Sequence, residues 1–71
     1  MPDMIPVVSS NIEAVGFDDE LEELTVEFKG GRLYSYDGVK RNVYDDLIKA
    51  PSVGSYFAAN IRGFYNYTKL K

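Results

Sequence analysis

The stretch at residues 24–36, LTVEFKGGRLYSY, decides the fold. Apolar and polar side chains alternate from Leu24 to Lys29, a pattern typical of a strand with one buried face. Two glycines follow, and Arg32 to Tyr36 then has strand composition. Two strand-like segments joined by a glycine turn predict a β-hairpin.

The length of the glycine turn decides where Tyr34 and Tyr36 point, because residues two apart on a strand share a face. A two-residue Gly-Gly turn places both rings on the face away from Val26. A three-residue loop that also includes Lys29 pairs Val26 with Tyr34 and places both rings in the core. A small core favours the second arrangement. The first would expose two rings suited to stacking on unpaired bases.

The segment before the hairpin contributes one more expected strand. Residues 12–17 have strand composition, but their apolar positions do not alternate cleanly, which predicts a bulge or burial on both faces near Gly16. Residues 1–7 include two prolines and an acid, and we expect them to form a disordered lead-in. A chain of 71 residues has room for one core, so residues 8–71 are expected to form a single domain.

After the hairpin, the apolar residues recur at helical spacing. Residues 39–50 predict one amphipathic helix, which Pro51 ends. Ser52 is a suitable N-cap for a second helix, and Gly63 is a suitable place for that helix to end. The aromatic tail at residues 64–71 is expected to pack back on the domain. The sequence therefore predicts an α+β fold, with a three-stranded antiparallel sheet followed by two helices on one face, in the order β-β-β-α-α.

The residue types that are absent exclude several kinds of chemistry. The chain has no histidine and no cysteine, which removes imidazole bases, thiolate nucleophiles and the usual zinc ligands. Five carboxylates in residues 18–23 lack the ligand spacing of a calcium loop and indicate a solvated turn. We therefore expect no catalysis, no cofactor and no metal. No leader or membrane-spanning run is visible, so the expected compartment is the cytoplasm, without membrane contact.

The charge is unevenly distributed along the chain. The formal net charge is −3, yet residues 1–23 hold seven acids and no base, whereas residues 24–71 hold eight bases and four acids. A local positive field can therefore exist beside an acidic first third. The net charge does not exclude a polyanionic partner.

Two kinds of partner fit these features. The candidate nucleic-acid-binding residues combine the two hairpin tyrosines with a basic side chain of the hairpin and basic side chains of the two predicted helices. They are Arg32, Tyr34, Tyr36, Lys40, Arg41 and Arg62. The alternative is a protein partner, or a second copy of the chain, that docks on the sheet edge or on the aromatic tail. The sequence does not set the oligomeric state.

A family resemblance covers nearly the whole chain from Val8 onward. The chain resembles the KTSC domain, a short module named from its occurrence at the C-terminus of some lysyl-tRNA synthetases. The resemblance begins with Ser9-Ser10-x-Ile12 and Val15-Gly16-Phe17. It continues through Leu24-x-Val26-x-Phe28, Gly31, Tyr34-x-Tyr36, Val39, Val43-Tyr44, Leu47, Ala50, Ser52, Gly54, Tyr56-Phe57, Ile61-Arg62 and Tyr65-x-Tyr67.

The resemblance implies a small module that also occurs alone in bacterial and phage proteins, for which RNA binding has been suggested. Two features depart from the family pattern. Lys40 stands where a proline usually follows the position of Val39. The turn at residues 18–23 is also richer in carboxylates than the pattern requires, which counts against a nucleic-acid role.

Overall fold

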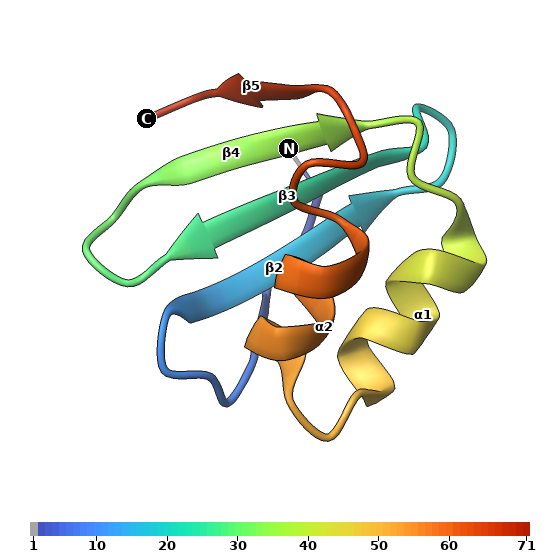
Figure 1. Ribbon diagram of the computed structural model, residues 1–71. Helices are drawn as coiled ribbons and strands as arrows, with labels where there is room; N and C mark the ends of the chain where they lie inside the picture. The colour runs from blue at the N-terminus through green and yellow to red at the C-terminus, as the bar shows by residue number, and fades with distance from the viewer. Residues whose placement is uncertain (1) are drawn as a thin grey trace.

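Five strands form one antiparallel sheet, and they lie side by side in chain order. The structure is a computed structural model that describes residues 2–71. The predicted α+β class is confirmed, but the predicted count of three strands is wrong. The strands are β1 (Ile5–Pro6), β2 (Ile12–Asp18), β3 (Glu23–Phe28), β4 (Leu33–Asp37) and β5 (Tyr67–Lys69) (Figure 1).

Both additional strands come from segments that the sequence pattern left outside the sheet. Strand β1 lies within residues 1–7, the expected disordered lead-in, and pairs with β2 through Ile5 and Pro6. Met1 lies outside the described residues. Strand β5 is formed by the aromatic tail and places Tyr67 opposite Tyr36. Strands of two and three residues are too short to display a period of two, which explains why the pattern missed them.

The hairpin has the three-residue loop. The Phe28 N–H donates to the Arg32 carbonyl over 2.8 Å, and Val26 lies opposite Tyr34. Gly30 and Gly31 in the loop have φ values of +100° and +92°, which glycine adopts without steric cost. The tyrosines therefore face the same side of the sheet as Val26, where the helices pack. The register also shifts between Ile12 and Ala14 of β2, so the expected bulge is present, but nearer the start of the strand than Gly16.

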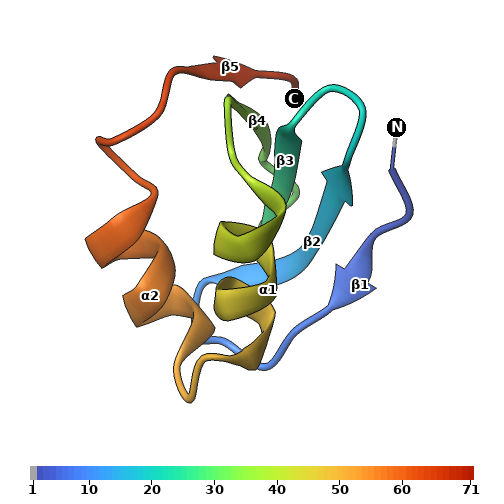
Figure 2. The ribbon, with the colours of Figure 1, turned by 90° about the vertical axis from the view of Figure 1, so that its right-hand side faces the viewer.

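Two helices cover this side of the sheet (Figures 1 and 2). They are α1 (Arg41–Lys49) and α2 (Val53–Asn60). The Ser52 hydroxyl accepts a hydrogen bond from the Ser55 N–H over 3.3 Å, so Ser52 is the N-cap of α2 as predicted. Lys40 occupies the N-cap position of α1 without a capping side-chain bond. Gly63, with φ +88°, follows the end of α2 and turns the chain toward β5.

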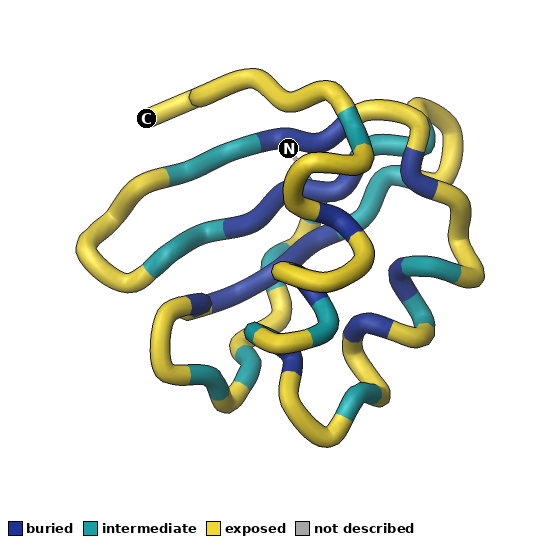
Figure 3. The backbone as a smooth tube through the Cα atoms, viewed as in Figure 1, coloured by how far each residue is buried: buried dark blue, intermediate teal, exposed yellow. Residues whose placement is uncertain are grey.

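The core lies between the sheet and the helices. Apolar side chains of β2, β3 and β4 meet the inward side chains of α1 and α2 there, and the buried stretches of backbone follow these elements (Figure 3). The last strand and the segment before it are mostly exposed. The buried core side chains are Ile12, Val15, Leu24, Val26, Tyr36, Val39, Tyr44, Leu47, Val53, Phe57 and Ile61.

Candidate functional site

A groove lined largely by aromatic side chains opens between the end of α2 and strands β4 and β5. Its volume is about 320 Å³. Three tyrosines and a phenylalanine form its wall, and two arginines stand among its lining residues. We call it the aromatic groove, and its lining residues are Asn11, Phe28, Arg32, Tyr34, Tyr36, Arg62, Gly63 and Tyr67.

The sheet register brings the rings together. Because Tyr67 lies opposite Tyr36, and Tyr34 lies two positions from Tyr36 along the same strand, all three rings project from the same face. The Tyr67 ring centroid is 5.9 Å from that of Tyr36 and 5.7 Å from that of Tyr34. The edge of Phe28 meets Tyr34 at 5.6 Å. Phe57 of α2 packs against Tyr36 at 5.3 Å and supports it from the core side.

The three tyrosines differ in exposure. Tyr36 is 4% exposed, Tyr34 is half-buried, and Tyr67 is 62% exposed. Burial raises the pKa of Tyr36 above its ordinary value of 10.0, and nearby Tyr34 and Tyr67 add to the rise while Arg62 opposes it. The Tyr36 phenol therefore stays protonated at neutral pH. Within residues 2–71, none of the three hydroxyls forms a side-chain hydrogen bond.

Two arginines line the groove without carboxylate partners. The Arg32 guanidinium lies 5.5 Å from the centre of the Phe28 ring, a cation–π contact. Arg62 follows the end of α2 and lies near Tyr36. Neither arginine forms an ion pair with a described carboxylate. Both positive charges are therefore free to meet an anion.

The structure brings together four of the six predicted site residues, namely Arg32, Tyr34, Tyr36 and Arg62. The other two do not line the groove. Lys40 pairs with Glu22 over 2.8 Å, and Arg41 pairs with Asp19 over 2.7 Å. These two bases neutralise the acidic turn before β3 instead of contributing to the groove.

Sequence reasoning missed Asn11, Phe28 and Tyr67 as lining residues. Phe28 was assigned to the alternating face of its strand, with no indication that it reaches the surface. Tyr67 lies in the tail that is expected to pack back, and a strand of three residues leaves no periodic sign in the sequence. Nothing in the sequence around Asn11 indicates that it reaches the groove.

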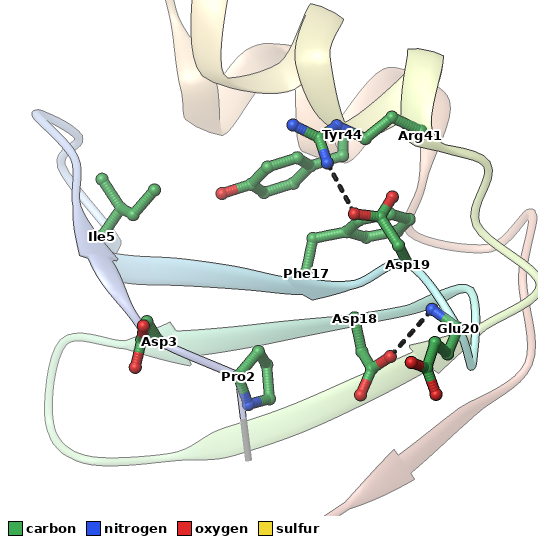
Figure 4. A pocket seen from close by; sticks show the side chains of 9 residues that line it. All are labelled: Pro2, Asp3, Ile5, Phe17, Asp18, Asp19, Glu20, Arg41 and Tyr44. Carbon is green, nitrogen blue, oxygen red and sulfur yellow. Dashed lines mark hydrogen bonds and ion pairs between the residues drawn. The ribbon is translucent and has the colours of Figure 1, made fainter.

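A second cavity lies at the opposite corner of the molecule, beside β1 and α1 (Figure 4). We call this cavity, of about 570 Å³, the N-terminal pocket. The Phe17 and Tyr44 rings stack inside it with centroids 5.0 Å apart. Arg41 also bonds Asp45 over 3.1 Å, and this bond together with Asp19 raises the pKa of the guanidinium. Four carboxylates against one paired arginine make this pocket acidic; the lining residues are Pro2, Asp3, Ile5, Phe17, Asp18, Asp19, Glu20, Arg41 and Tyr44.

The sheet face away from the helices is also acidic. Strand alternation places Glu23, Glu27 and Asp37 on that face, together with the buried Thr25 and Ser35. None of these three carboxylates forms an ion pair with a described base. The aromatic groove, by contrast, has no carboxylate among its lining residues.

Metal and membrane chemistry find no support in the described part of the chain. Residues 2–71 contain no group of three metal-ligating side chains placed to hold an ion. None of the helices described is long and apolar enough to cross a membrane.

Comparison with known proteins assigns the chain to a family. The sequence profile of the KTSC domain matches residues 8–67. The chain belongs to the KTSC domain family. A KTSC domain protein from Yersinia pestis has the same fold, with a TM-score of 0.93, 29% identity and complete coverage of both chains. The resemblance inferred from the sequence motifs is thereby confirmed.

Other relatives of this KTSC chain differ widely in length. A protein of Tsukamurella paurometabola is 45% identical over 53 residues, which are 75% of this chain and 79% of that protein. A lysine–tRNA ligase of Nostoc sp. is 38% identical over 61 residues, which are 86% of this chain but only 11% of the ligase. KTSC sequences therefore occur both in small proteins and as a small part of a much longer enzyme.

Proposed function

We propose that this KTSC chain is a non-enzymatic module that binds single-stranded RNA in the aromatic groove. One observation carries the proposal. The groove combines the exposed ring of Tyr67 and the half-buried rings of Phe28 and Tyr34 with Arg32 and Arg62, which form no ion pair with a described carboxylate. Aromatic rings stack on unpaired bases, and unpaired guanidinium groups bind phosphates. No other cavity described above joins these two properties.

The distribution of charge over the molecule also favours RNA binding at the aromatic groove. The N-terminal pocket and the outer sheet face carry the acidic groups, whereas the groove lies beside β5, which contributes Lys69. A polyanion that approached the acidic surfaces would be repelled. The net charge of −3 therefore describes the whole chain and not the groove.

The ligase relatives also support RNA as the ligand class. Three lysine–tRNA ligases contain a segment 34–38% identical to 61 residues of this chain. These enzymes act on tRNA, and a segment that binds RNA would add affinity for that substrate. In this chain, RNA binding by the groove would not depend on a catalytic domain.

Binding of a labelled, unstructured RNA of about twelve nucleotides tests the proposal by fluorescence anisotropy across a salt series. The wild-type Kd is expected to rise with salt, with a slope of about 0.7 in log–log form for each phosphate contact. The double variant Arg32→Gln/Arg62→Gln is expected to bind at least about tenfold more weakly. The slope of its salt dependence is expected to fall by the equivalent of roughly two phosphate contacts.

A matched control removes the same number of charges from the ion-paired region. Lys40→Gln/Arg41→Gln is expected to change the Kd by less than about twofold, because both bases are already paired with carboxylates. Equal losses in the two double variants would show only a general charge effect. Absence of binding to any RNA at low salt would refute the proposed function.

A second candidate function is protein binding at the edge of the sheet. The aromatic tail forms the edge strand β5, so the expected tail surface coincides with one of the two sheet edges, and β1 forms the other edge. Asp37 N–H donates to the Asn66 carbonyl, and the antiparallel alternation therefore turns the backbone groups of Tyr67 and Lys69 outward. An extended segment of another chain can pair with these groups.

Sedimentation velocity over a range of concentrations tests self-association at this edge. If two copies pair through β5, Lys69→Pro is expected to abolish the dimer, because proline removes an outward N–H without touching the bonds to β4. Thr68→Ala is the matched control on the same strand. A monomer at every concentration, together with no partner that depends on Lys69, would exclude this function.

A further inference from the structure

The aromatic groove presents one free stacking surface. Tyr36 is 4% exposed and its ring is covered by Phe57, while Phe28 and Tyr34 are half-buried against each other. Tyr67, at 62% exposure, is the groove ring that presents most of its surface to solvent. Among the groove rings, Tyr67 is therefore the one most open to a stacked base.

The rings also stand too close together for a base to enter between them. The centroids of Tyr34 and Tyr67 are 5.7 Å apart, with an interplanar angle of 47°. A base inserted between two parallel rings needs about 7 Å, twice the rise of about 3.4 Å between stacked bases. The tilted rings therefore line a concave site and do not form a flat platform for successive bases.

The volume of the groove fits one nucleotide. At about 320 Å³ it lies at the lower end of the range of about 300–1,000 Å³ that is usual for small-ligand sites. Arg32, beside the hairpin loop, and Arg62, beyond α2, offer charges from two different elements. A nucleotide stacked on Tyr67 would therefore share the groove with two guanidinium groups that can bind its phosphates.

Polar groups in the groove can contact the edge of that base. The hydroxyls of Tyr34 and Tyr36 have no described side-chain partner. The Ser9 hydroxyl donates to the Asn11 side-chain oxygen over 3.0 Å, which leaves the Asn11 amide hydrogens for a ligand. Gly54 allows this arrangement, since a Cβ there would lie 2.8 Å from the same oxygen. These groups therefore give the groove hydrogen-bond donors and acceptors that can contact the edge of a bound base.

We infer that the aromatic groove binds one unpaired nucleotide, at a strand end or extruded from a stem, with its base on Tyr67. The inference rests on the proposed function and narrows its ligand from single-stranded RNA in general to a single nucleotide. The unpaired carboxylates of Glu23, Glu27 and Asp37 on the outer face would repel a strand that continued around the sheet edge.

Three sets of RNA test the inference by fluorescence anisotropy. The first is a stem with one bulged nucleotide, the second is the same stem fully paired, and the third is a series of unstructured oligonucleotides of two, four and eight residues. We expect the bulged stem to bind at least about tenfold more tightly than the paired stem. We expect the association constant of the oligonucleotides to rise at most in proportion to their length. A longer oligonucleotide only offers more copies of the single nucleotide that the groove binds.

The outcomes separate the inference from the proposed function. An affinity that rises steeply from two to eight nucleotides, with no preference for the bulge, overturns the inference and leaves RNA binding in place. Failure of every RNA to bind overturns the proposed function. Nucleoside monophosphates are tested as competitors. If they bind in the groove while no RNA does, the single-nucleotide occupancy stands and its source is the free nucleotide.

Variants of Tyr67 provide a direct readout of stacking. A bulged 2-aminopurine is expected to lose fluorescence on binding to the wild-type chain and to Tyr67→Phe, and to keep it with Tyr67→Leu. Tyr67→Leu retains apolar bulk on β5 and guards against loss of the strand, and its affinity is expected to fall about tenfold. Phe64→Ala, which removes an aromatic side chain that is 69% exposed outside the groove, is the matched control with no expected change. Equal quenching by the wild type and Tyr67→Leu would overturn the assignment.

Discussion

The aromatic groove and the N-terminal pocket both place an arginine over an aromatic ring, yet they differ in what they can bind. Arg32 lies 5.5 Å from the Phe28 ring in the aromatic groove, and Arg41 lies 6.0 Å from the Tyr44 ring in the N-terminal pocket. Arg41 is held by two carboxylates, whereas Arg32 pairs with none in the described chain. The availability of a cation is therefore set by the acids that the fold brings beside it.

The fold creates this difference from residues far apart in the sequence. The acidic turn between β2 and β3 lies beside the start of α1, where Asp19 meets Arg41 and Glu22 meets Lys40. Strand β5 brings no acid to the groove. Four predictions use this difference, in order of decreasing expected effect.

The largest effect is expected from removing the support beneath the groove. Phe57 is 1% exposed and contacts the rings of Phe28 and Tyr36. Phe57→Ala is expected to lower the free energy of unfolding by about 3–5 kcal/mol. That loss is comparable with the whole stability of a domain of this size. Urea unfolding followed by circular dichroism measures it, with Phe64→Ala as an exposed aromatic control. A loss below about 1 kcal/mol would show that the groove does not depend on this contact.

A second variant disturbs the N-terminal pocket alone. A Cβ at Gly16 would lie 2.8 Å from the Asp3 carbonyl oxygen and 2.9 Å from the Met4 sulfur. Gly16→Ala is expected to cost about 1–3 kcal/mol by displacing this segment. Hydrogen exchange should accelerate in β1 and β2, while the amides of β5 serve as the internal control. Equal acceleration in β5 would mean that the two regions are not independent.

A third variant removes the carboxylate partners of the arginine in the N-terminal pocket, so that this arginine becomes as unpaired as those of the aromatic groove. Asp19→Asn/Asp45→Asn leaves Arg41 without carboxylate partners. Because both ion pairs are exposed, stability is expected to change by less than about 1 kcal/mol. RNA affinity at low salt is expected to rise by up to about threefold, with a steeper salt dependence. An unchanged slope would indicate that the remaining acids of the pocket still repel the polyanion.

The smallest effect concerns the pH dependence of stability. The pKa of Tyr36 is raised in the folded state, mainly by burial, so the folded state favours the neutral phenol. Its contribution is complete below about pH 10 and is lost as the pH rises through the folded-state pKa. Tyr36→Phe should therefore reduce the fall in unfolding free energy above pH 10. Part of the fall should remain, because burial also raises the pKa of Tyr44 and Tyr56. Identical alkaline curves for Tyr36→Phe and wild type would contradict this assignment.

Much of the fold could be predicted from the sequence because its elements repeat with clear periods. The hairpin, both helices and the Ser52 cap follow from alternation, helical spacing and capping chemistry. The turn length was not decided by the residues alone, since both registers satisfy a Gly-Gly turn. Strands β1 and β5 depend on pairing with a sheet that already exists, and local pattern carries little trace of such pairing.

The site was only partly predictable because it depends on contacts between distant segments. The residues around Gly30 and Gly31 allow Tyr34 and Tyr36 either in the core or exposed, and the structure has the core arrangement, with Tyr36 buried and Tyr34 half-buried. They lie on the core face, but at an end of the sheet that the helices leave open. Arg41 was grouped with Arg32 by charge alone. Its neutralisation by Asp19 depends on a turn whose position relative to α1 is set by tertiary structure.

The chain-order sheet also sets the sequence of events in folding. Strands β1 to β4 are joined by short connections, so each can pair soon after its neighbour. Strand β5 follows both helices, and its pairing with β4 closes a much longer loop. We therefore expect β5 to dock last and to open first, so that an unfolding domain loses its aromatic groove while its core is still intact.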